Sequence, residues 1–124
     1  MAFKFENLKV WEKAVDLSGE ISDAVKNFPK DELFVLTSQI KRASDSISLN
    51  IAEGSTGQTN PEFRKFLGYS LRSAIEVVGC IFLAKRRKLF TTDQFDHLYE
   101  ACRINKRHPS FTEFDKITNI VHGP

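Results

Sequence analysis

The side chains in this sequence that could do chemistry are chiefly cations, and they occur in runs. Lys85 to Lys88 reads KRRK without interruption, and Arg103 to His108 contains three further cations and a histidine. Lysine and arginine neutralise nucleic-acid phosphates, in contacts that weaken steeply as salt rises. The competing interpretation is a solvated helix C-terminus whose cations offset the macrodipole, which accounts for one or two residues of the run. Because few aromatic residues lie among the cations, we expect contact with the phosphate backbone and no stacking on bases.

The sequence around this run is also basic. Between Asn60 and Leu89 seven cations stand against only Glu62 and Glu76, although the whole chain carries a net charge of +2. The hypothesis that follows is a surface for RNA or DNA phosphates. Eight cations are expected to contribute to it: Lys41, Arg64, Lys65, Arg72, Lys85, Arg86, Arg87 and Lys88.

Patterns typical of catalytic or metal sites do not appear in the sequence. Metal sites in helical bundles use inward carboxylates with Glu-x-x-His pairs, and none of His97, His108 and His122 follows a glutamate at that spacing. No glycine-rich loop resembles a phosphate cradle, and nothing places a serine, a histidine and an aspartate as a triad. The sequence therefore predicts a protein that is not an enzyme and needs no metal or cofactor.

The two cysteines, Cys80 and Cys102, form neither a Cys-x-x-Cys motif nor a zinc-binding spacing. If the third and fourth helices turn near residue 91, the two cysteines face each other as small apolar side chains. A redox switch is the alternative, but no cue for a lowered thiol pKa accompanies it. With no signal peptide at the N-terminus, this cysteine usage predicts a cytoplasmic protein with reduced thiols.

A polar stripe is predicted along the second helix. Arg42, Ser46, Asn50 and Glu53 follow one another at spacings of four, four and three. If the second and third helices turn near residue 57, Arg42 lies near Ser73 and within a turn of Glu76. We expect the stripe and its partners to make hydrogen bonds that fix helix register, since half-buried polar groups normally have partners. The set is Arg42, Ser46, Asn50, Glu53, Ser73 and Glu76, and the alternative role is a surface for phosphate or a partner chain.

Periodicity and turn residues divide the 124 residues into helices. Apolar residues at spacings of three and four predict a first helix over about residues 8–28, ended by Pro29. Its inward residues are expected to be Leu8, Trp11, Ala14, Ser18, Ile21, Val25 and Phe28. A second helix is predicted over about residues 31–53, ended by Gly54. Its apolar stripe is expected to be Leu33, Leu36, Ile40, Ala43, Ile47 and Ile51. A third runs from Asn60 to about residue 89, and over residues 74–84 it is apolar nearly all round, as in a helix that is central or covered by another chain.

Thr91 to Gln94 is a capping-box pattern that opens a fourth helix. Pro109 should end or kink that helix, and a second capping box at Ser110 to Glu113 predicts a short extra C-terminal helix. Short connections favour antiparallel neighbours, so we expect one all-α domain over residues 1–124, an up-down-up-down antiparallel four-helix bundle. The longest apolar stretch, Val77 to Ala84, is far shorter than the ~20 residues of a membrane span, so no membrane partner is expected.

Several motifs together resemble one known family. FENLKVWEKA at residues 5–14 resembles F-x-x-L-x-V-W-x-K-A, and FPKDE at residues 28–32 resembles F-P-x-x-E. QIKRA at 39–43, Ser46-Ile47 and NIAEG at 50–54 resemble the family's central signature, and Phe66-Leu67, Ser73 and Glu76 resemble its third helix. The combination, over about residues 3 to 100, is similar to the four-helix-bundle proteins encoded in intervening sequences of bacterial 23S ribosomal RNA genes. It is similar also to the accessory variability protein of diversity-generating retroelements.

The resemblance implies a four-helix up-down fold, a ring-shaped homopentamer and a basic nucleic-acid-binding surface, with no known catalysis. In the retroelement relative the partner is a reverse transcriptase, which does not follow for this chain. Two departures from the family pattern stand out. Arg72 stands where the family usually has a small residue, and the segment from Ile104 onward, with Pro109, departs from an uninterrupted fourth helix.

Two functional hypotheses follow from these observations. The leading one is a homo-oligomer that binds RNA or DNA phosphates without catalysing a reaction. Its rival is a structural or adaptor oligomer that binds a protein partner, such as a reverse transcriptase, through an apolar face of the third helix. Only the first predicts binding that depends strongly on salt.

Overall fold

The computed structural model describes residues 3–57 and 59–107, with side chains placed as far as residue 103. Within these residues the elements are all helical. The four main helices are α1 (Lys9–Ala24), α2 (Ser38–Ser55), α3 (Asn60–Arg86) and α4 (Thr92–Arg107). Short elements complete the order, namely η1 (Lys4–Asn7) before α1, and η2 (Val25–Asn27), η3 (Lys30–Glu32) and the π-helical η4 (Leu33–Thr37) between α1 and α2.

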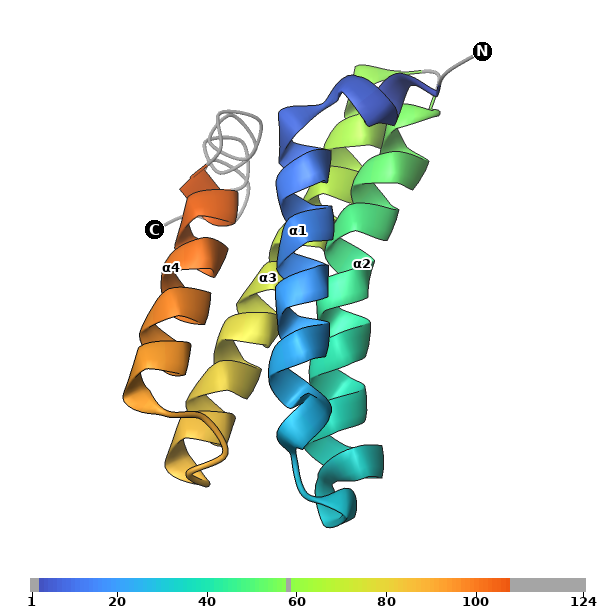
Figure 1. Ribbon diagram of the computed structural model, residues 1–124. Helices are drawn as coiled ribbons and strands as arrows, with labels where there is room; N and C mark the ends of the chain where they lie inside the picture. Colours follow the sequence, from blue (N-terminus) through green and yellow to red (C-terminus); the bar gives the residue numbers. More distant parts are fainter. Residues whose placement is uncertain (1–2, 58, 108–124) are drawn as a thin grey trace, which may run out of the picture.

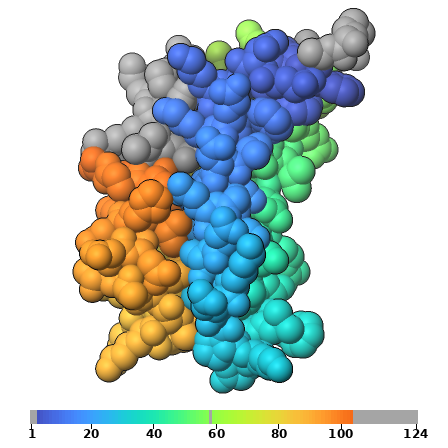
Figure 2. Space-filling view, in the orientation of Figure 1, coloured from blue at the N-terminus to red at the C-terminus, as the bar shows by residue number. Residues whose placement is uncertain are grey.

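The main helices run alternately down and up and form a bundle (Figure 1). Each packs against two neighbours, in the cyclic order α1, α2, α3, α4 and back to α1, with α2 and α3 forming the most extensive pair. Figure 2 shows α1 at the front between α4 and α2. The predicted all-α up-down-up-down four-helix bundle is confirmed. The predicted extra C-terminal helix and the effect of Pro109 lie outside the described residues.

The core consists of one apolar stripe from each main helix. α2 contributes Ile40, Ile47 and Ile51, each fully buried, as its periodicity predicts. The predicted stripe of α1 is rotated slightly from the observed one, because Val10 and Leu17 are buried whereas Trp11 and Ser18 are only half-buried. The Ser18 hydroxyl instead donates a hydrogen bond to the Asp45 carboxylate on α2.

The third helix has two different apolar faces. Val77 and Ile81 are fully buried against the bundle, whereas Ile75, Phe82 and Leu83 are between 45% and 55% exposed. Among the described residues α3 is the one helix long and apolar enough to cross a membrane, but the core helix of a bundle meets the same test. α3 is thus a core helix that also carries a second apolar face, whose large side chains are about half exposed in the part of the chain that the structure describes.

Gly54 allows the close approach of α2 and α3. It was predicted to end the second helix, but α2 continues through Ser55 and Gly54 is buried within it. A Cβ atom at Gly54 would lie 2.5 Å from the Cβ of Phe66 and 3.1 Å from the ring of Phe63. Because the Phe66 Cβ is fixed to the backbone of α3, a side chain at residue 54 would have to push the two helices apart.

We therefore predict that Gly54→Ala destabilises the protein by about 1–3 kcal/mol, the usual penalty for overpacking a core. The matched control is Gly19→Ala in α1, where no atom lies within 4 Å of an added Cβ. There the helix propensity of alanine should stabilise by about 0.5–1 kcal/mol. Chemical denaturation of both variants measures the two effects, and changes of the same sign would contradict the close contact at Gly54.

Candidate nucleic-acid interface

Two helix connections meet at one end of the bundle. The α1–α2 connection, with η2, η3 and η4, lies beside the α3–α4 connection at the lower end in Figure 1. The ring centroids of Phe28 and Phe90 lie 5.0 Å apart across them. An Nη1 atom of Arg87 donates to both carboxylate oxygens of Glu32, at 3.0 and 2.9 Å. These contacts hold the two connections, and the cations they carry, in one place.

The basic run, residues 85–88, occupies this end, and its four side chains differ in their contacts. The Lys85 ammonium lies 4.3 Å from the centroid of the Phe95 ring, a cation–π contact with α4. Arg87 is held by Glu32. Arg86 and Lys88 are exposed and have no ion-pair partner within the described part of the chain. The run therefore divides into two anchored cations and two that project toward solvent.

Lys88 adopts a backbone conformation that normally selects glycine. It is the one non-glycine residue with positive φ among those described, at 60°. The N–H of Leu89 donates to the carbonyl of Ala84, and the N–H of Lys88 donates to that of Lys85. These two bonds form the Schellman motif, whose left-handed position is usually glycine. A lysine there carries a conformational penalty that the fold itself does not require.

Lys88→Gly should therefore stabilise the protein by about 1 kcal/mol, because glycine enters the left-handed region without a Cβ clash. Thermal or chemical denaturation measures the change, with Lys88→Ala as the control that removes the charge and keeps the Cβ. If both substitutions shift stability equally, the charge and not the backbone is responsible, and the strain at residue 88 is refuted.

Of the other four predicted phosphate-binding cations, three do not lie at this end: Arg64, Lys65 and Arg72. Arg64 and Lys65 lie in the first turns of α3, and the 22 residues from Arg64 to Arg86 span about 33 Å of helix. Lys65 lies 5.9 Å from the Tyr69 ring centroid. Arg72 is exposed midway along α3. Lys41 is the exception, because it lies in the first turn of α2 and lines a hollow together with Lys26 and Lys30. The eight predicted cations thus do not form one continuous patch.

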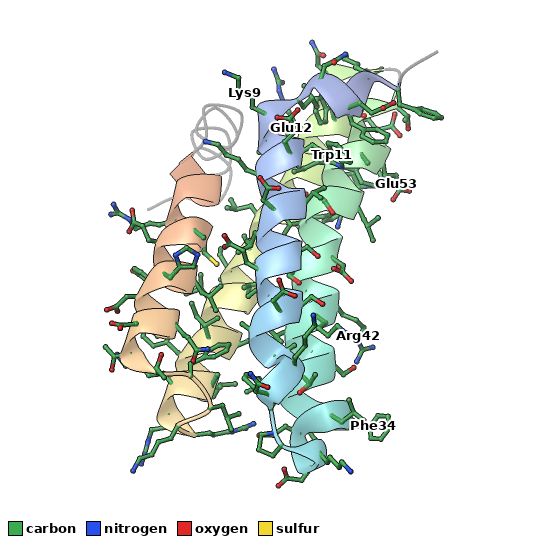
Figure 3. The ribbon with its side chains drawn as sticks, in the orientation of Figure 1. Lys9, Trp11, Glu12, Phe34, Arg42 and Glu53 are labelled. Atoms are coloured by element: carbon green, nitrogen blue, oxygen red, sulfur yellow. The ribbon has the colours of Figure 1, made fainter. Side chains whose placement is uncertain are left out.

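Two lysines that sequence reasoning missed lie at this end. Lys26 belongs to η2 and Lys30 to η3, both exposed in the connection beside the basic run. An up-down topology could have predicted them, since it brings the first and third connections to the same end. We call the surface of Lys26, Lys30, Lys85, Arg86 and Lys88 the basic end, and Figure 3 shows nitrogen-bearing side chains extending there. The acids Asp23, Asp31 and Glu32 lie on the same connection and moderate its charge.

The polar stripe of α2 lies along a hollow between α2 and α3. Arg42, Ser46, Ser73 and Glu76 are among the residues that line this hollow of about 410 Å³. Figure 3 places Arg42 in the lower half of α2 and Glu53 near its upper end. The predicted neighbourhood is therefore present. Arg42 and Glu76 are both exposed, however, and no ion pair joins them in the described structure.

The hydrogen bonds of the stripe are local. Ser46 donates to the carbonyl of Arg42, and Asn50 donates to that of Ser46, both at 2.8 Å within α2. Register between α2 and α3 is instead marked by the buried Ser70, whose hydroxyl donates to the carbonyl of Ile47 at 2.7 Å. Ser70 could not be identified from the sequence, because a single serine within an apolar helix face does not reveal which carbonyl its hydroxyl contacts.

The two cysteines are buried core residues. Cys80 and Cys102 are each 2% exposed and both are free thiols. Burial, with a smaller effect of the Glu76 carboxylate, raises the pKa of Cys80. Burial, with a smaller effect of Glu20, raises the pKa of Cys102 to about 12. Raised pKa values disfavour the reactive thiolate, so the geometry does not support the redox alternative.

The pKa of Cys102 makes stability depend on pH. An unfolded thiol ionises near 9.0 and folded Cys102 near 12, so unfolding releases a proton between these values. The free energy of unfolding should therefore fall as pH rises from 9 to 12, by up to about 1.4 kcal/mol per pH unit from this group. Cys102→Ala should show a shallower fall in denaturation measured across this range. Equal slopes for the two proteins would contradict a buried, protonated thiol.

The fold and the site define a class: a helical bundle that carries the basic run of residues 85–88 at one end. No cluster of three or more histidine, cysteine, aspartate or glutamate side chains suited to a metal occurs in the part of the chain that the structure describes. The sequence profile of the 23S rRNA-intervening sequence protein family matches residues 6–108. The chain belongs to this family, and the resemblance carried by its motifs is confirmed.

A solved structure shares this fold. The chain is similar to a crystal structure, at 1.70 Å resolution, of a protein with unknown function from the S23 ribosomal protein family from Bacteroides thetaiotaomicron. The two are 23% identical, the match covers 93% of this chain and 99% of that chain, and the TM-score is 0.68. No curated protein matches the chain. The relation to the retroelement accessory variability protein stays a prediction.

Proposed function

We propose that this protein is a non-enzymatic homo-oligomer that binds the phosphate backbone of RNA or DNA through its basic end. The observation that carries the proposal is Lys88. A lysine occupies a left-handed position that favours glycine, beside the exposed and unpaired Arg86. Strained residues concentrate at functional sites. Membership of a family named for an intervening sequence in 23S rRNA is consistent with an RNA ligand.

The charge at the basic end limits how many phosphates one chain can neutralise. Glu32 holds Arg87, and Asp23 lies 3.0 Å from the Lys26 ammonium. The Asp23–Lys26 pair is largely exposed, so it is worth little and Lys26 can turn to a phosphate. With about four phosphates per chain, the binding constant of one protomer for duplex would fall with a log–log salt slope of about −3.6. Assembly of several chains would multiply the number of phosphates contacted and therefore the salt dependence of binding. The proposal accordingly includes the homopentamer that the family resemblance implies.

The test uses the double variant Arg86→Gln/Lys88→Gly. This variant loses two cations, and its Lys88→Gly substitution is expected to stabilise the fold. Its salt slope should be smaller by about 2 units than that of the natural chain, because each lost phosphate contact removes about one. The matched control is Lys9→Gln/Lys13→Gln, which removes the same charge from exposed positions of α1. Gel shifts with one RNA and one DNA of the same sequence, titrated with salt, measure both slopes.

Three outcomes of these gel shifts would contradict the proposed interface. Equal slopes in the double variant and its control would show that net charge, and not the basic end, controls binding. An Arg64→Gln/Lys65→Gln variant that loses more affinity than Arg86→Gln/Lys88→Gly would move the interface to the opposite end of α3. Binding that does not change with salt in any variant would contradict nucleic-acid binding through phosphates altogether.

The outer face of α3 favours a second candidate, an adaptor oligomer that binds a protein partner. Ile75, Phe82 and Leu83 are about half exposed on this face, and Phe34 on η4 is 88% exposed. Figure 3 shows Phe34 projecting from the bundle. Exposed apolar patches commonly mark protein interfaces. Light scattering identifies self-association through these residues. Nucleic-acid binding that does not depend on salt in the gel shifts would favour the adaptor over the nucleic-acid-binding protein.

A further inference from the structure

A cavity lies between the end of α1 and the start of α2, next to the basic end. Its volume is about 320 Å³, at the lower limit of small-molecule sites. Its polar lining comes from five successive elements of the chain: Ser22, Lys26, Lys30, Thr37 and Lys41. No carboxylate is among the residues that line it, so the cavity favours an anion over a cation.

Thr37 brings a buried hydroxyl without a hydrogen-bond partner to the wall of the cavity. The residue is only 8% exposed, and its hydroxyl is the one buried side-chain polar atom in the described residues without a hydrogen-bond partner. Ser44 and Ser46 of α2, by contrast, donate to backbone carbonyls three or four residues earlier. A buried polar group without a partner in the chain is commonly satisfied by a bound ion, water or ligand.

The backbone around Thr37 is also unusual. Thr37 ends the π-helical turn η4 (Leu33–Thr37), which leads directly into α2. π turns are rare and occur frequently at functional sites. The turn places Thr37 and Lys41 on the cavity side of the same helical segment, opposite Ser22 from the end of α1 and Lys26 from η2.

We propose that this cavity binds a phosphoryl group. Three ammonium groups and two hydroxyls supply donors and charge for a tetrahedral dianion, and charge-assisted bonds to such an anion are the strong ones. Val25, Phe28, Pro29 and Leu33 form the remaining walls and would contact the organic part of a phosphate ester. Lys26 and Lys30 also belong to the basic end, but the binding of a small anion in this cavity does not require a nucleic acid.

Two acids lie close enough to matter. Asp23 pairs with Lys26, and Asp45 lines an adjoining hollow together with Lys41. Asp23 opposes an anion only weakly, because its pair with Lys26 is largely exposed. Asp45 offsets part of the positive charge that Lys41 brings to the cavity. Lys30 has no ion-pair partner among the described residues. Its ammonium group is therefore available to the ligand.

The test compares Thr37→Val, which keeps the shape and removes the hydroxyl, with Thr37→Ser, which keeps the hydroxyl. Melting temperatures are measured in inorganic phosphate and in chloride at equal ionic strength. In chloride Thr37→Val should melt above the natural chain, because an unsatisfied buried hydroxyl has been removed. Phosphate at about ten times its Kd should raise the melting temperature of the natural chain and of Thr37→Ser by about 5 °C, and that of Thr37→Val much less.

Lys30→Gln should weaken phosphate binding about tenfold. The control Lys9→Gln, at the other end of α1, should bind phosphate with the same affinity as the natural chain. A second arm replaces inorganic phosphate with a short oligonucleotide bearing either a 5′-phosphate or a 5′-hydroxyl. A shift that needs the 5′-phosphate identifies a nucleic-acid end as the source, and a shift with inorganic phosphate alone identifies a free anion. Equal phosphate shifts in Thr37→Val and Thr37→Ser, or no shift with either probe, would overturn the proposal.

Discussion

The close contact between α2 and α3 is the interaction on which the rest of the structure depends. Gly54 lets the two helices approach until the Phe66 side chain fills the space of a missing Cβ, and the buried Ser70 hydroxyl bonds to the Ile47 carbonyl. Because this pair is the most extensive in the bundle, it fixes the direction of α3. The direction of α3 in turn decides which end of the bundle receives the basic run.

The placement of the basic run is a consequence of topology as much as of composition. In an up-down bundle the first and third connections share an end, so Lys26 and Lys30 meet Lys85 to Lys88 there. Glu32 and Arg87 lock the two connections together, and the cavity at Thr37 opens beside them. Tertiary structure therefore collects onto one end cations that are more than fifty residues apart in the chain.

Much of the fold follows from the sequence, because strong periodicity and turn residues leave few alternatives. The isoleucines of α2 and the Thr91–Gln94 capping box, with hydrogen bonds of 2.8 and 3.1 Å between them, match their predictions. The site is less predictable. Arg64 and Arg86 are on one helix, and a count of charges does not show that about 33 Å of helix separates them. The role of Gly54 and the unsatisfied Thr37 hydroxyl depend on neighbours from other segments, which no local pattern encodes.

The most direct measurement of the proposed role is lysine footprinting by mass spectrometry, with a limiting acetylating reagent, on the protein alone and bound to RNA. The proposed interface predicts that Lys30, Lys85 and Lys88 become protected while Lys4, Lys9 and Lys13 keep their reactivity. Protection concentrated at Lys65, or spread evenly over all exposed lysines, would contradict nucleic-acid binding at the basic end.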